Sequence, residues 1–309
     1  LQIEALTVLR GQRVVIDRLT HQQNLGQLCI LTGANGAGKS TTMKIITGFL
    51  SPSQGEVNIC GNDISTHPLD AKRLIGYLPE GAPCYDEMTP RNFLNFIAEI
   101  RGFSGSEREA RVRSVVQTLS LQGVLNQRIE TLSKGFKRRV GFAQAIIHDP
   151  LVLILDEPTD GLDPNQKHHV RQMIRGFAKN KIVIISTHVL EEVAAVCSRT
   201  LIIANGRRVA DCTPAELEAK SLYHLAVRVT ADTDELEAIQ EYMGAPASVK
   251  EIQRDGQDLL LIPSEPKTNL LLELLEGQKK NHWSIRGLSQ EKGRLDEVFR
   301  EITGESVDA

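Results

Sequence analysis

Short apolar runs alternate with helical periods in the first part of the chain. Residues 28–31, 151–155 and 182–185 are almost wholly apolar and have the length of buried strands. Residues 42–49 and 165–177 repeat their apolar positions with a helical period. Buried strands that alternate with helices predict an α/β fold, with a mostly parallel sheet that helices cover on both faces.

A long helical stretch interrupts this alternation. From residue 89 to about residue 148, apolar side chains recur at helical spacing, first at Phe93, Phe96, Ile97 and Ile100. No strand-like run lies within this stretch. We therefore expect a helical subdomain, at about residues 87–148, inserted between the strands of the sheet.

The pattern changes after Asp211. It predicts strands at residues 225–229, 248–253, 259–262 and 284–288, and helices at residues 234–243, 269–277 and 294–303. Their order is β-α-β-β-α-β-α, which is typical of a small ferredoxin-like α/β domain. We expect two domains, residues 1–221 and residues 222–309.

Composition and charge exclude several classes of protein. Apolar residues make up 41% of the chain and charged residues 24%, which is typical of a globular protein and not of a disordered one. Lys and Arg number 36 against 39 Asp and Glu, so the net charge of −3 argues against a nucleic-acid partner. The apolar runs fall far short of the ~20 residues of a membrane span. No charged-then-apolar leader opens the sequence, so we expect a cytoplasmic protein.

Cysteine and histidine do not indicate a metal framework. The five cysteines are scattered without a C-x-x-C pair, which is typical of reduced thiols. The adjacent His168 and His169 have no cysteine or carboxylate at ligand spacing, and we expect them on a helix surface.

Residues 33–41, Gly-Ala-Asn-Gly-Ala-Gly-Lys-Ser-Thr, join a predicted strand to a predicted helix and match G-x-x-x-x-G-K-[ST]. The glycines let successive backbone N–H groups face a phosphate, Lys39 is expected to reach the β- and γ-phosphates, and Ser40 to bind Mg²⁺. The predicted nucleotide-binding residues are Gly33, Asn35, Gly36, Ala37, Gly38, Lys39, Ser40 and Thr41. The motif indicates a nucleoside triphosphate without separating kinases, GTPases, helicases and transport ATPases.

Two carboxylates follow the apolar run at residues 151–155. Parallel strands deliver their carboxyl ends to one sheet edge, so Asp156 and Glu157 are expected beside the phosphate loop. Asp156 is placed to hold Mg²⁺ and Glu157 to polarise the attacking water as general base. The second carboxylate favours hydrolysis over phosphoryl transfer to a hydroxyl, and so an ATPase over a kinase.

A third motif, Leu132-Ser133-Lys134-Gly135, opens a basic helix, where Ser133 suits the N-cap and Gly135 leaves its N–H accessible to an anion. In chain order the chain carries the phosphate loop, residues 132–135, residues 155–159 (Leu-Asp-Glu-Pro-Thr), residues 161–164 (Gly-Leu-Asp-Pro) and residues 186–188 (Ser-Thr-His). This set, over about residues 1–214, resembles the ATP-binding subunits of ABC transporters. Residues 76–80 and the tail residues 295–299 are similar to the exporter branch, which includes gliding-motility and drug-export subunits.

The resemblance implies a head-to-tail dimer of two copies that enclose ATP and Mg²⁺ between them. One copy would supply the phosphate loop, Asp156, Glu157 and His188, with His188 sensing the γ-phosphate and helping to hold the water. The other copy would supply its Ser133, Lys134 and Gly135. Asp163 would lie at the dimer seam and couple the two sites.

The resemblance also implies a membrane partner. Residues 80–101, with Pro83, Met88, Phe93 and Phe96, would receive a short cytoplasmic helix of a separate integral membrane permease. The protein would then lie on the inner face of the cell membrane.

Two positions depart from the family pattern. Glu80 stands where the family usually has glutamine; a carboxylate still reaches Mg²⁺ but adds negative charge near the phosphates. Residues 8–15 contain no aromatic side chain to stack on adenine, so Arg10 or Arg13 would stack through a guanidinium, or Val15 would give an apolar contact.

Two other functions compete with that of a transporter subunit. A soluble ABC-type ATPase without a permease, acting in assembly or regulation, is compatible with the length, although the exporter-like tail argues against it. A phosphate-loop kinase is disfavoured by Glu157, His188 and residues 132–135 together. The C-terminal domain carries no catalytic set of residues, and we expect it to regulate the protein or to stabilise the dimer.

Overall fold

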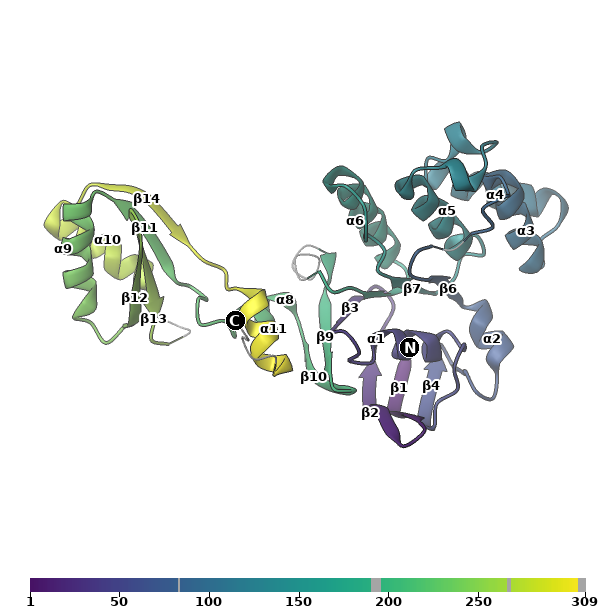
Figure 1. Ribbon diagram of the computed structural model, residues 1–309, viewed down its shortest axis with the longest axis horizontal. Helices are drawn as coiled ribbons and strands as arrows, with labels where there is room; N and C mark the ends of the chain where they lie inside the picture. The colour runs from purple at the N-terminus through teal and green to yellow at the C-terminus, as the bar shows by residue number, and fades with distance from the viewer. Residues whose placement is uncertain (83, 190–195, 266–267, 305–309) are drawn as a thin grey trace. The chain divides into compact units, whose positions relative to one another are not determined.

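The computed structural model describes residues 1–82, 84–189, 196–265 and 268–304 (Figure 1). The chain forms two compact units, Leu1–Asp211 and Cys212–Ala309. The division falls before the boundary expected at residue 221, because helix α8 (Pro214–Glu218) packs with α11 (Leu295–Thr303) of the second unit. Within the described residues, no helix is long and apolar enough to cross a bilayer.

A six-stranded sheet forms the centre of the first unit, in the order β10-β9-β3-β8-β7-β6. Its strands are β3 (Leu28–Thr32), β6 (Ile75–Leu78), β7 (Val152–Asp156), β8 (Ile182–Ser186), β9 (Arg199–Ala204) and β10 (Arg207–Cys212). From β9 to β6 each neighbouring pair is parallel. Every residue of β3, β7 and β8 is buried, so the predicted parallel sheet with covered faces is confirmed.

A second sheet was not predicted. It is antiparallel and has the order β2-β1-β4-β5, with β1 (Gln2–Arg10), β2 (Arg13–Gln22), β4 (Gln54–Ile59) and β5 (Asn62–Asp63). The pairing of β1 with β2 shifts register repeatedly, and Ala5 and Arg18 take left-handed φ angles of 45° and 50°. These irregularities interrupt the two-residue alternation that reveals a strand in a sequence.

Helix α1 (Lys39–Ile46) joins the two sheets into one core, with Met43 and Ile45 among buried side chains of both. The first unit also contains the helices α2 (Pro68–Arg73) and α6 (Pro164–Ala178). The first residues of α1 belong to the phosphate loop, and the buried residues that follow them (Thr42, Met43, Ile45 and Ile46) anchor the helix in this core.

The helical subdomain contains α3 (Pro90–Ile100), α4 (Gly105–Thr118), two short 3₁₀ turns (Gln122–Val124, Ile129–Thr131) and α5 (Lys134–Ile146). Thr89 caps α3 by accepting the Asn92 N–H at 3.3 Å, and α5 packs against β6. Phe93 is only 2% exposed, which corrects its expected place on a docking surface: it belongs to the core of this subdomain. Pro83 of the same expected surface lies outside the described residues.

The second unit follows the predicted order of strands and helices. It comprises β11 (Val227–Ala231), α9 (Thr233–Gly244), β12 (Val249–Asp255), β13 (Asp258–Pro263), α10 (Leu270–Asn281) and β14 (Ile285–Gln290). The strands form an antiparallel sheet in the order β12-β13-β11-β14. Trp283 is buried in its core, edge-on to Tyr242 with ring centroids 5.2 Å apart. The ferredoxin-like classification of this unit stays a prediction.

Candidate functional site

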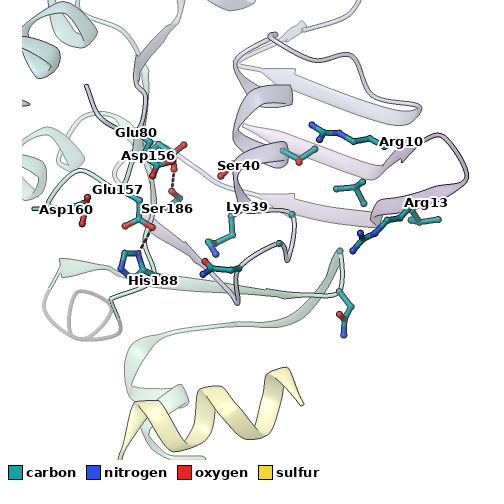
Figure 2. A pocket seen from close by; sticks show the side chains of 18 residues that line it. Arg10, Arg13, Lys39, Ser40, Glu80, Asp156, Glu157, Asp160, Ser186 and His188 are labelled. Atoms are coloured by element: carbon teal, nitrogen blue, oxygen red, sulfur yellow. Dashed lines mark hydrogen bonds and ion pairs between the residues drawn. The ribbon is translucent and has the colours of Figure 1, made fainter. Parts of the chain in front are cut away.

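A cavity of about 640 Å³ opens where the parallel strands β3, β6, β7 and β8 end (Figure 2). Loops that follow these carboxyl ends supply most of its wall, as expected for the ligand site of an α/β sheet. The lining residues are Arg10, Arg13, Val14, Val15, Asn35, Gly36, Gly38, Lys39, Ser40, Thr41, Glu80, Asp156, Glu157, Asp160, Ser186, His188, Asn205 and Gly206.

The phosphate loop is shaped by its glycines. Gly36 and Gly38 take left-handed φ angles of 78° and 112°, and Gly38 is the N-cap of α1. A Cβ on Gly33 would lie 2.2 Å from the backbone oxygen of Ile203, so only glycine fits there. The loop thus brings a nest of N–H groups and the positive end of α1 to the cavity, a ready site for an anion.

Lys39 turns back on its own loop. Its Nζ donates hydrogen bonds to the carbonyl oxygens of Gly33 at 2.6 Å and Ala34 at 3.0 Å. Burial lowers the pKa of Lys39, and the negative charges of Glu157 and Asp156 oppose that shift. The ammonium therefore lies in a partly buried site near two carboxylates. An incoming phosphate would compete with the Gly33 and Ala34 carbonyls for its hydrogen bonds.

The acidic pair lies at the end of β7. Asp156 is buried and accepts a hydrogen bond from the Ser186 hydroxyl. Glu157 takes a left-handed φ of 46°, its N–H donates to the Ser186 carbonyl at 3.1 Å, and its Oε1 lies 2.9 Å from His188 Nδ1. Burial raises the pKa of Glu157, while the hydrogen bond and charge of His188 oppose the rise. A carboxylate with a raised pKa is a better proton acceptor for water.

The oxygen donors at the cavity fit Mg²⁺. Ser40, Glu80 and Asp156 all line it, and Mg²⁺ prefers hard oxygen ligands, commonly one or two carboxylates completed by waters and substrate phosphates. The described residues hold no cluster of three or more His, Cys, Asp or Glu side chains that would bind a metal by itself. The hydroxyl of Ser40 and the carboxylates of Glu80 and Asp156 are the ligand types that fit Mg²⁺ bound together with a nucleotide.

The hairpin between β1 and β2 forms the opposite wall. Arg10 and Arg13 are paired across it, and both line the cavity together with Val14 and Val15 (Figure 2). The candidates that the sequence offered for contact with a base are thus at the cavity. None of these four side chains is aromatic.

The signature residues lie elsewhere. The described lining of the cavity does not include Ser133, Lys134, Gly135 or Asp163. Ser133 caps α5 by accepting the Phe136 N–H at 3.4 Å, and Asp163 caps α6 by accepting the Gln166 N–H at 2.9 Å. The two caps are neighbours, because a Cβ on Gly135 would lie 2.2 Å from Gln166 Oε1.

Several lining residues were not predicted. Asp160 lies three residues after Glu157, a spacing that could have drawn attention to it. Asn205 and Gly206 arrive through long-range pairing: Gly206 N–H donates to the Ala37 carbonyl at 3.0 Å, and a Cβ on Gly206 would lie 2.4 Å from the Val15 carbonyl oxygen. The Asn-Gly pair signals a turn, but no local pattern places that turn at the cavity.

A second, more apolar groove of about 940 Å³ borders the helical subdomain. Its lining includes Phe49, Leu69 and Ile100, which are 71%, 72% and 65% exposed. Basic side chains surround these residues: Lys44, Lys72, Arg73 and Arg101. Ile97, Ile100 and Arg101 belong to the segment expected to meet a permease, whereas Phe49 and Leu69 come from other parts of the chain.

Comparisons with known proteins give one family. A family model described as "ABC transporter" matches residues 16–160. The "Nod factor export ATP-binding protein I" of Paraburkholderia xenovorans is 33% identical over 96% of this chain and 94% of its own length. The "Uncharacterized ABC transporter ATP-binding protein YxlF" of Bacillus subtilis is 36% identical over 67% of this chain and 68% of its own. A solved ATP-binding subunit of an ABC transporter is 31% identical, with TM-score 0.65 over 70% of this chain and 91% of that one.

Proposed function

The chain belongs to the ATP-binding proteins of ABC transporters, and we propose that it powers export through a separate membrane permease. It is an ATPase of the ABC type. Export is supported by the likeness to Nod factor export proteins, which runs across both compact units. The observation that carries the proposal is the cavity in which the phosphate loop, Asp156, Glu157 and His188 meet.

The nucleotide would bind with its triphosphate along residues 33–41. Lys39 would exchange the Gly33 and Ala34 carbonyls for the β- and γ-phosphates, which are stronger acceptors. Ser40, Asp156 and Glu80 would hold Mg²⁺, which when bound neutralises phosphate charge and orients the γ-phosphate.

Glu157 would act as general base on the attacking water. As the water oxygen bonds to the γ-phosphorus, Glu157 takes its proton, the bond from that phosphorus to the β–γ bridging oxygen breaks, and ADP and phosphate leave. His188, 2.9 Å from Glu157, would fix the carboxylate and donate to the γ-phosphate. Lys39 and the loop N–H groups would stabilise charge on the transferred group.

A second copy of the chain would complete each site. The signature residues do not line the cavity of their own chain, and Ser133 and Lys134 are exposed. Such an exposed helix N-terminus can bind a phosphate held by another copy. Asp163, which caps α6 beside Gly135, would then lie at the seam and link the two sites.

The basic-rimmed apolar groove would receive a helix of the permease. Exposed Phe49, Leu69 and Ile100 would bury apolar side chains of that helix, and the four basic residues would pair with its acids. This docking would hold the protein on the inner face of the membrane.

The test compares wild type with Glu157→Gln for MgATP hydrolysis and for size in ATP by size-exclusion chromatography. We expect the wild type to hydrolyse ATP, and the variant to lose at least about a hundredfold in rate and to accumulate as an ATP-bound dimer. Transfer of phosphate to a small acceptor without hydrolysis would overturn the proposal.

The permease is tested by co-purification with membrane proteins encoded beside this chain. Leu69→Glu with Ile100→Glu should abolish that association and leave hydrolysis by the isolated subunit unchanged, since both residues lie outside the nucleotide cavity. Leu272→Glu, which changes an exposed leucine of the second unit, is the matched control.

A further inference from the structure

Helix α5 packs closely against its surroundings at two glycines. A Cβ on Gly135 would meet the Gln166 side chain, and one on Gly141 would lie 2.7 Å from Leu78 Cδ1 and 2.8 Å from Ala82 Cβ. The two glycines are six residues apart, so they lie about 120° from each other around the helix axis. The helix thus rests on the start of α6 at Gly135 and on the segment around Glu80 at Gly141.

A charged residue lies between these two contacts. Arg138 is three residues from each of the two glycines and only 6% exposed. Its Nη2 donates to the carbonyl oxygen of Asp160 at 3.3 Å, in the segment that follows Glu157. Its Nη1 is buried and has no hydrogen-bond partner among the described residues. A buried N–H donor without a hydrogen-bond partner lowers the free energy of unfolding. An apolar side chain at position 138 would therefore make the fold more stable than this arginine does.

Nearby negative charges are possible partners for Nη1 of Arg138. Glu80, Asp156, Glu157 and Asp160 bring four carboxylates to one cavity, and a bound triphosphate adds further negative charge. Burial lowers the pKa of Arg138, and Asp160, Glu157, Glu80 and Asp156 all oppose that shift. Arginine stays protonated in such a site, whereas a buried lysine or histidine can lose its proton. Arginine is therefore better suited to neutralise the negative charge of nearby carboxylates.

We propose that Arg138 is a positioning residue that pairs through Nη1 with the Glu80 carboxylate when nucleotide binds, and so ties α5 to both loops of the nucleotide cavity. Glu80 is the partner because Gly141, three residues after Arg138 and so its neighbour on the helix surface, packs on Leu78 and Ala82, which flank Glu80. The pair would offset the negative charge that Glu80 adds in place of the usual glutamine. This inference rests on the proposed function, since α5 begins with the signature residues offered to the second copy.

The experiment measures kcat and KM for MgATP in Arg138→Met, Arg138→Lys and the control Lys137→Met. Lys137 is the neighbouring basic residue and does not line the cavity, and its Nζ lies 3.8 Å from Asp86 Oδ1. We expect Arg138→Met to lower kcat about tenfold with KM changed less than about twofold, because a positioning residue acts on the transition state more than on binding. Arg138→Lys should restore part of kcat, and Lys137→Met should match wild type.

A double-mutant cycle with Glu80→Gln then identifies the partner. In the Glu80→Gln background we expect Arg138→Met to cost less than about threefold, because the charge that it offsets is gone. An equal loss in both backgrounds would overturn the pairing, as would a kcat for Arg138→Met equal to that of wild type. A melting temperature that falls in step with kcat, without rescue by lysine, would make Arg138 a packing residue and also overturn it. A wild type without MgATP hydrolysis would instead overturn the proposed function.

Discussion

The phosphate loop and the signature segment are both short glycine-containing turns before a helix, yet their surroundings differ. The phosphate loop follows a fully buried strand, and Gly33 abuts backbone, the Ile203 carbonyl. The signature segment follows a 3₁₀ turn, leaves Ser133 exposed, and sets Gly135 against a flexible side chain, Gln166. This difference agrees with the proposed function, in which the phosphate loop holds the nucleotide of its own chain and the signature segment contacts the nucleotide held by a second copy.

The largest expected effect tests this arrangement directly. In the proposed dimer, Lys39→Ala would remove a contact with the phosphates of the nucleotide bound to the same chain, and Ser133→Arg a contact with the nucleotide bound to the second copy. Each variant alone should therefore lose at least about a hundredfold in ATPase rate. Mixed together, they should regain about a quarter of wild-type activity, because half of randomly formed dimers are mixed and each of these has one intact site of two.

The measurement is steady-state phosphate release at equal total protein. Mixing either variant with buffer or with a doubly substituted chain is the control. If the signature acted on the nucleotide of its own chain, each chain in the mixture would still have a damaged site and the mixture would stay inactive.

Stability gives the next contrast. Gly33→Ala should lower the free energy of unfolding by about 3 kcal/mol, since backbone at Ile203 cannot move away from the new methyl group. Gly135→Ala should change it by less than about 1 kcal/mol, because the end of Gln166 can move and alanine favours the helix. Urea unfolding of both variants measures the difference. Equal losses would show that both turns are held by equally rigid surroundings.

A smaller effect is expected at the Glu157–His188 pair. In its proposed role as general base, Glu157 acts only when deprotonated, so activity should fall as the pH drops through its raised pKa. His188→Ala removes a hydrogen bond and a charge that lower this pKa, so the acid limb should move to higher pH and kcat should fall about tenfold. The pH–rate profile measures the shift. A limb that moves to lower pH would show that His188 does not support the carboxylate.

Local patterns predicted the parts of the site that are contiguous in the chain. Residues 33–41 and the pair Asp156–Glu157 each combine a buried strand with the residues that follow it, so their place at one sheet edge follows from topology. Arg138 and Gly206 reach their positions through packing between distant segments, which no spacing encodes. The antiparallel sheet was missed for a related reason, because bulges in β1 and β2 break the alternation.

The groove beside the helical subdomain is a second case in which local patterns do not predict which side chains are exposed. Phe93 and Phe96 lie in one helix, and the sequence offered them as surface, but Phe93 turns inward because α3 must cover a core of its own. Phe49 and Leu69 form the exposed apolar surface instead, and they are brought to α3 by the fold of the first unit. A side chain's neighbours decide its exposure, and these neighbours are distant in the chain.

The smallest expected effect concerns the wall opposite the phosphate loop. Arg10→Ala or Arg13→Ala should each raise KM for ATP about two- to threefold, because an exposed guanidinium stacked on a base contributes little. Arg18→Ala is the matched control, an exposed arginine of β2 that does not line the cavity. Because stacking does not read hydrogen-bond donors or acceptors, KM for GTP should rise by the same factor as KM for ATP. A rise confined to ATP would mean that these arginines hydrogen-bond to the adenine edge, and discrimination between bases would then be a property of this hairpin.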